Sequence, residues 1–116
     1  MTSLPHDHGS NSHHFLMPHN EDFLTISDLF KQLADPTRIR IFWLLCHCEE
    51  CVINLSALMG MSSPAVSHHL KQLRSAGLIV SRRDGKEVFY RAANSDQAQL
   101  LHEMIEDMVK ITCPTN

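Results

Sequence analysis

The sequence predicts a mainly α-helical domain that carries one small β-hairpin. Two stretches at 53–60 and 63–76 have apolar residues at helical spacing and are separated by a tight turn. Two strand-like stretches follow at 79–83 and 87–92, and the Asp-Gly pair between them is typical of a hairpin turn. A helix, a turn, a second helix and a hairpin in this order form a winged helix-turn-helix.

Length and charge limit what such a domain can do. The chain has 116 residues, enough for one core, and its net charge is −3. Residues 62–91 hold six Lys and Arg against one Asp and one Glu, so this segment carries +4 and the remainder −7. The local positive charge favours an anionic partner. No apolar run approaches the ~18 residues of a membrane span, and the first residues do not resemble a secretory signal. We therefore expect a cytoplasmic protein with no membrane partner.

Residues 1–20 differ in composition from the rest of the chain. They contain two prolines, little apolar periodicity and five histidines, which are His6, His8, His13, His14 and His19. We predict a flexible tail at 1–20 and a folded domain at 21–113. Neutral imidazoles bind zinc or nickel, so His6, His8, His13 and His14 are secondary metal-binding candidates. An incidental histidine-rich leader and a weak metal-scavenging arm are the alternatives.

Two helices are predicted at the start of the domain. Residues 21–34 have an amphipathic pattern whose apolar face is broad for a small monomer. Asp35 and Pro36 then begin a second helix, with Asp35 as its N-cap and Pro36 in its first turn. This second helix runs to Cys46 or His47 and is apolar nearly all round, so we expect it to form the buried core.

The segment CHCEEC at 46–51 holds three of the four cysteines of the chain. A disulfide framework is not expected in a reducing compartment. Closely spaced thiolates repel one another as anions, and a soft or borderline ion relieves that repulsion. The spacing permits chelation by a turn. We therefore predict that Cys46, Cys48 and Cys51 bind zinc, cadmium, lead or trivalent arsenic, with His47 as a further candidate ligand.

The helix at 63–76 has one apolar face and one polar face. Ser62 or Ser63 can cap its first turn, Pro64 suits that turn, and Gly77 can supply a left-handed stop. Hydroxyl and imidazole groups can bind base edges in a DNA major groove, and cations can hold phosphates. The candidate DNA contacts on this helix and near the hairpin tip are Ser62, Ser63, Ser67, His68, His69, Lys71, Arg74, Arg82, Arg83 and Lys86. An ordinary amphipathic helix is the alternative.

The last predicted helix spans 95–111 and has an apolar stripe with no obvious partner inside the chain. Together with the apolar face of 21–34, this stripe predicts a homodimer. Cys113 follows the helix and is a candidate fourth thiolate, donated across the dimer, or else an unengaged terminal thiol. His102 and Glu106 share a face of the helix at i and i+4, and we interpret them as a surface pair, with a separate ion site as the alternative.

Three stretches resemble the ArsR/SmtB family of metal- and arsenic-sensing repressors: ADPTRIRIFWLL, SSPAVSHHLKQLRSAGLI and SRRDGKEVFYRA. The resemblance covers about residues 24–111. It implies a dimer formed by the first and last helices, with the two recognition helices about one DNA turn apart.

The ion sites of that family are only partly matched. Its soft-metal sensors carry a cysteine pair separated by one residue before the recognition helix, and here Cys51 is present but Ile53 occupies the second position. Its zinc sensors use Asp, His, His and Glu or His on the final helix. The matching positions here are Asn94, Asp96, Asp107 and Lys110. Lysine at a ligand position argues against that zinc site.

The function predicted from the sequence is a homodimeric transcriptional repressor that binds double-stranded operator DNA when metal-free and is released when an ion binds at the Cys-rich site. The alternative is a thiol redox or persulfide sensor on the same scaffold, which would use two of the four cysteines as a reversible bridge. An enzyme is not expected, because catalytic zinc needs a general base in a pocket and only Glu49 and Glu50 stand beside the cysteines.

Overall fold

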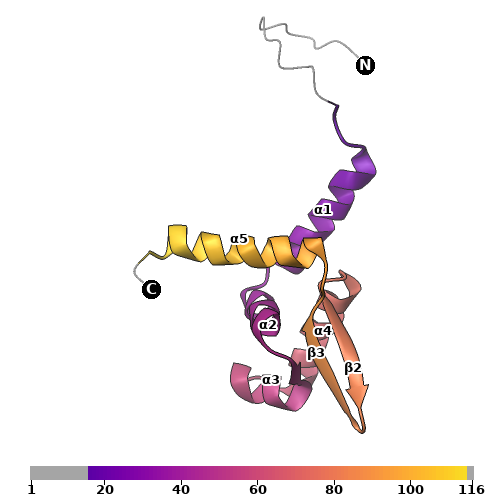
Figure 1. Ribbon diagram of the computed structural model, residues 1–116, viewed down its shortest axis with the longest axis vertical. Coiled ribbons are helices and arrows are strands. Elements are labelled where there is room, and N and C mark those ends of the chain that lie inside the picture. Colours follow the sequence, from indigo (N-terminus) through magenta and orange to yellow (C-terminus); the bar gives the residue numbers. More distant parts are fainter. Residues whose placement is uncertain (1–15, 115–116) are drawn as a thin grey trace, which may run out of the picture.

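The computed structural model describes residues 16–114, which form five helices and one three-stranded antiparallel sheet (Figure 1). The elements are α1 (Asn20–Gln32), α2 (Pro36–His47), β1 (Glu50–Cys51), α3 (Val52–Met59), α4 (Ser63–Ser75), β2 (Ile79–Asp84), β3 (Glu87–Ala92) and α5 (Asp96–Thr112). Helices α3 and α4 form the helix-turn-helix, and β2 with β3 forms the wing. The predicted fold class is confirmed. His6, His8, His13 and His14 lie outside the described residues.

The core lies where α2, α3, α4, α5 and the start of β2 meet. Its buried apolar side chains are Ile41, Phe42, Leu45, Leu55, Val66, Leu70, Leu73, Leu78, Ile79, Ala98 and Leu101. Burying a large apolar side chain contributes roughly 1.5–3 kcal/mol, so this cluster is the main source of stability. Helix α2 contributes Ile41, Phe42 and Leu45 to this core, as expected, although Trp43 on its outer side is 39% exposed.

Polar caps and one left-handed glycine position the helix-turn-helix. Oδ1 of Asp35 accepts a hydrogen bond from the backbone N–H of Arg38 before α2 (3.0 Å), and Oγ of Ser62 accepts one from Ala65 before α4 (3.3 Å). Gly60 ends α3 with φ +64°, a conformation that L side chains rarely adopt. These caps confirm the helix starts predicted for α2 and α4.

The sheet has the strand order β1-β3-β2. In the wing, Ile79 pairs with Ala92 and Asp84 pairs with Glu87. The two turn residues are therefore 85 and 86, one position later than the Asp-Gly turn that the sequence predicted. Strand β1 pairs with β3 through Glu50 opposite Tyr90 and Cys51 opposite Phe89, and it was not predicted because two residues show no alternating pattern.

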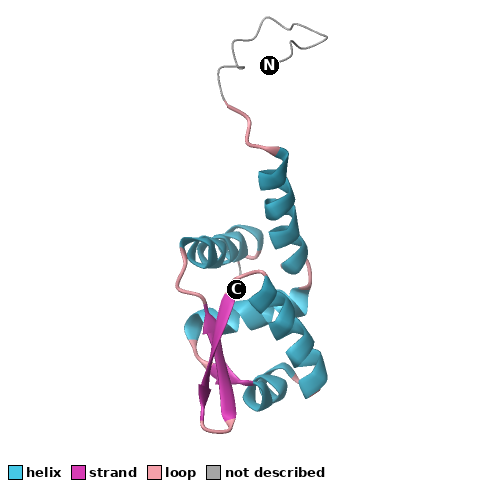
Figure 2. Cartoon of the chain, turned by 90° about the vertical axis from the view of Figure 1, so that its right-hand side faces the viewer, coloured by secondary structure: helices cyan, strands magenta, loops and turns pink. Residues whose placement is uncertain are grey.

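Helices α1 and α5 extend beyond the core (Figures 1 and 2). Figure 1 shows α1 projecting away from the rest of the chain, while α5 crosses the end of the core opposite the hairpin tip. No residue of α1 is buried. Exposed apolar side chains on these two helices are Phe23, Leu24, Ile26, Phe30, Leu100, Met104, Met108, Val109 and Ile111. None of the described helices has the length and apolar character needed to cross a bilayer.

Candidate functional site

Helix α4 has one buried face and one exposed polar face. Val66, Leu70 and Leu73 are at most 2% exposed and hold the helix against the core. The opposite face carries exposed hydroxyl, imidazole and cationic groups, from Ser67, His68, Lys71 and Arg74. Ser62 and Ser63 are also exposed, but Ser62 caps the helix and Oγ of Ser63 lies 3.1 Å from Oγ of Ser56. The core therefore holds α4 so that its polar face is exposed, and an α-helix fits the major groove of DNA.

His69 does not belong to that exposed face. Its side chain is 9% exposed, and Nδ1 accepts a hydrogen bond from Nε of Arg38 (3.2 Å). Arg38 also donates to the carbonyl and side-chain oxygens of Gln32. The prediction that His69 contacts DNA is corrected, because this imidazole links α4 to α2 inside the domain. The signal was in the sequence, since position 69 follows Val66 by three residues and precedes Leu73 by four.

The wing carries the three predicted cations, but they differ in environment. Arg82 donates three hydrogen bonds of 2.6–2.9 Å to the carboxylate of Glu49, and its guanidinium lies 4.9 Å from the centroid of the Phe89 ring. These bonds hold the pKa of Glu49 below its usual range. Arg83 and Lys86 are exposed nearer the tip. Arg82 therefore ties the wing to the segment between α2 and α3.

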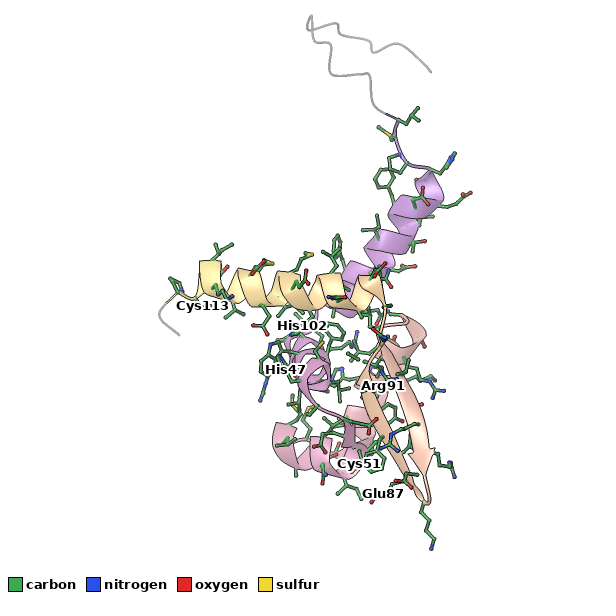
Figure 3. The ribbon with its side chains drawn as sticks, in the orientation of Figure 1. His47, Cys51, Glu87, Arg91, His102 and Cys113 are labelled. Atoms are coloured by element: carbon green, nitrogen blue, oxygen red, sulfur yellow. The ribbon has the colours of Figure 1, made fainter. Side chains whose placement is uncertain are left out.

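Within one protomer, the four predicted thiol ligands do not converge. Cys46 is half-buried in α2, and Sγ of the exposed Cys48 donates to the carbonyl of Leu44 (3.4 Å). Cys51 is 7% exposed in β1, and Figure 3 shows Cys113 at the far end of α5. Cys48 and Cys51 both have extended backbone, and pairing of β1 with β3 holds the conformation of Cys51. An extended segment spaces its residues about 3.3 Å apart, so it cannot chelate as a turn.

Two of these cysteines are also protonated, whereas a cysteine that binds a metal ion does so as a thiolate. Burial raises the pKa of Cys46 to about 11, and the negative charge of Glu106 adds to this shift. Burial and the charge of Glu50 also raise the pKa of Cys48. Both groups are therefore thiols near neutral pH, and a soft ion would have to displace their protons.

A different set of metal-ligating side chains does converge, where the last turn of α2 meets α5 (Figure 3). Nε2 of His47 lies 3.2 Å from Oε1 of Glu106 and 3.1 Å from Nε2 of His102. Nε2 of His102 lies 3.1 Å from the same carboxylate oxygen. Among the described residues, this is the group of three or more His, Cys, Asp or Glu whose ligand atoms all lie within 4.8 Å of one another. We call it the His-His-Glu cluster.

Trp43 holds the carboxylate of this cluster. Its indole Nε1–H donates to Oε1 of Glu106 (3.0 Å), and its ring centroid lies 4.3 Å from that of His47. Hydrogen bonds from Trp43, His102 and His47 lower the pKa of Glu106. The sequence indicated the His102 and Glu106 pair, but the arrival of His47 depends on how α2 packs against α5, which no local pattern reveals.

Comparisons with known proteins agree on the family. Residues 35–81 match the family model described as bacterial regulatory protein, arsR family. The transcriptional regulator KmtR of Mycobacterium tuberculosis is 39% identical over 80 residues, which are 69% of this chain and 62% of that protein. The arsenic resistance transcriptional regulator ArsR2 of Pseudomonas putida is 40% identical over 84 residues, which are 72% of each chain.

Solved structures give the same result for the fold. The homodimeric winged helix-turn-helix DNA-binding domain from Mycobacterium bovis superposes with a TM-score of 0.67 at 30% identity, over 81% of this chain and 91% of that one. The chain spans less than two thirds of the length of KmtR but 72% of ArsR2. The exposed polar face of α4 and the wing agree with these matches. The chain therefore belongs to the ArsR family of bacterial transcriptional regulators.

Proposed function

We propose that the protein is a homodimeric repressor that binds operator DNA through α4 and the wing and releases it when a metal or metalloid ion binds. The observation that carries the DNA-binding part is the outer face of α4, where Ser67, His68, Lys71 and Arg74 are exposed together. Hydroxyl and imidazole groups read base edges, and the two cations, with Arg83 and Lys86 of the wing, contact phosphates.

Exposed apolar surface supports the dimer. The described part of α1 has no buried residue, and α5 exposes Leu100 by 57% and Met108 by 58%. Apolar faces of this extent on two projecting helices favour burial against a second copy. The homodimeric relative from Mycobacterium bovis has the same fold. A two-fold axis through α1 and α5 would present two α4 helices to successive major grooves.

A soft or borderline ion is the effector that the cysteine segment 46–51 favours. The name of ArsR2 supports an arsenic-resistance role for that relative, and the three thiols of residues 46–51 have the chemistry to hold trivalent arsenic, cadmium, lead or zinc. Cys51 belongs to β1, so its movement toward Cys46 and Cys48 around one ion would displace β1 against β3. Since β3 is the central strand of the sheet and one of the two strands of the wing, such a rearrangement would couple ion binding to the DNA-binding surface.

The experiment begins by selecting the operator from random double-stranded DNA with the reduced, metal-free protein. Fluorescence anisotropy then gives affinities for the selected site. Ser67→Ala with His68→Ala should weaken specific binding by about 1–3 kcal/mol per lost base contact, while Ser75→Ala, at the far end of α4, is the matched control. Unchanged operator affinity in the double variant would show that α4 does not read the bases.

The effector part is tested on the same complex with arsenite, cadmium, lead and zinc. Release that disappears when Cys46, Cys48 and Cys51 are changed to serine supports the thiolate site. Release by an oxidant or sulfide with every metal chelated would instead establish the redox alternative. Operator affinity unchanged by all of these agents would contradict ion-responsive repression and leave DNA binding intact.

A further inference from the structure

The three contacts within the His-His-Glu cluster cannot all be hydrogen bonds at once. A neutral imidazole has one N–H, and a carboxylate oxygen only accepts. If Nε2 carries hydrogen in both His47 and His102, the two nitrogens face each other as donors at 3.1 Å. If one Nε2 lacks hydrogen, its lone pair faces Oε1 of Glu106. At most two of the three contacts are therefore hydrogen bonds.

A metal cation among the three atoms removes this conflict, since it accepts a lone pair from each. In a tetrahedral site with bonds of about 2.0–2.1 Å, neighbouring ligand atoms lie about 3.3 Å apart. The three separations in the cluster are 3.1–3.2 Å. The ligand atoms are thus already spaced as one face of a tetrahedron. Movements of a few tenths of an ångström complete that arrangement.

We propose that His47, His102 and Glu106 form a binding site for a borderline divalent cation, such as zinc, cobalt or nickel, within one protomer. Two imidazoles and one carboxylate suit these ions, whereas soft ions prefer thiolates and hard ions prefer oxygen alone. The site is separate from the positions at 94, 96, 107 and 110 and from the thiols of 46–51.

Access and orientation fit such a site. The side chains of His47, His102 and Glu106 are 43%, 26% and 37% exposed, so an ion can enter and water can fill the remaining position. The two histidines also line an open cavity of about 610 Å³ that includes Cys46 and Cys48. The hydrogen bond from Trp43 fixes the carboxylate from outside, as second-shell donors do in metal sites.

The position of the site gives it a regulatory consequence, which rests on the proposed function. His47 is the last residue of α2, and β1 and α3 follow it, whereas His102 and Glu106 belong to α5. A cation at the cluster fixes the angle between the helix that bears the apolar dimer face and the helix that leads into the helix-turn-helix. Ion binding would therefore change the spacing of the two α4 helices in a dimer.

The test uses the full chain, reduced and metal-free, titrated with cobalt, nickel and zinc chloride. Trp43 is the sole tryptophan, so its fluorescence reports the cluster locally, and cobalt absorption distinguishes nitrogen and oxygen ligands from thiolates. His102→Gln and Glu106→Gln remove one ligand each, and the amide of the second keeps an acceptor for Trp43. His68→Gln and Glu103→Gln are the matched controls, because both residues are exposed outside the cluster.

We expect saturable quenching of Trp43 by cobalt and nickel, and at least about 100-fold weaker binding in the two cluster variants, since losing a supporting group alone typically costs 10–100-fold. The controls, and a variant with serine at 46, 48 and 51, should keep the Trp43 response. The site is refuted if Trp43 does not respond, if both cluster variants bind as tightly as the wild type, or if only the serine variant loses binding.

Binding to the selected operator distinguishes failure of the ion site from failure of the proposed DNA-binding function. Bound cobalt that leaves operator affinity unchanged refutes the regulatory consequence. Failure of the metal-free protein to bind any selected DNA refutes the proposed function, whereas quenching of Trp43 still supports the ion site.

Discussion

His68 and His69 are adjacent in the sequence but have opposite environments. His69 is 9% exposed and accepts a hydrogen bond from Arg38, whereas His68 is exposed on the outer face of α4. His69→Ala removes that acceptor and leaves a cavity, so we expect the free energy of unfolding to fall by about 1–3 kcal/mol. His68→Ala should change it by less than about 0.5 kcal/mol. Urea unfolding measures both, and equal stabilities would contradict the role of His69 in joining α2 to α4.

The burial of His69 also makes the free energy of unfolding depend on pH. Desolvation lowers its pKa below 6.5, so the unfolded chain binds more protons than the folded protein just below that pH. The unfolding free energy should therefore fall as the pH falls from 6.5 toward the folded-state pKa. His69→Gln removes the titrating group, and its stability should depend less on pH between about 7.5 and 5.5. A wild-type curve no steeper than that of the variant would contradict this assignment.

Arg82 and Glu49 form an ion pair that joins the wing to the connection between α2 and α3. Both side chains reach solvent, so solvent screens their ion pair and it contributes little to stability. Glu49→Gln releases the guanidinium for a phosphate, and we expect tighter DNA binding with a salt dependence steeper by about one unit of slope. The control is Glu87→Gln, which changes the net charge equally on an exposed wing residue. Identical salt slopes for the two variants would show that Arg82 stays away from the DNA.

Elements with a local signal could be predicted from the sequence. Asp35 and Ser62 cap α2 and α4 as expected, because a cap depends on residues within one turn. Strand β1 could not be predicted, since it depends on pairing with β3 about 40 residues later. That pairing also holds Cys51 in a strand, while Cys46 belongs to α2, so the cysteine segment does not form one chelating turn. His47 joins the His-His-Glu cluster for the same kind of reason, a tertiary contact between α2 and α5.

At the scale of the whole molecule, the exposed apolar faces of α1 and α5 predict what a charge placed there would do. Met108 is 58% exposed on α5, and a dimer formed through this helix would bury it. Met108→Glu would then place an unpaired carboxylate in the interface, and we expect the dimer dissociation constant to rise at least about 100-fold. Operator affinity should fall with it, since each monomer reaches one half-site. Gln97→Glu adds the same charge at an exposed polar position of α5 and should leave the dimer intact. Sedimentation velocity measures both variants, and a Met108→Glu protein that sediments as a dimer would place the interface elsewhere.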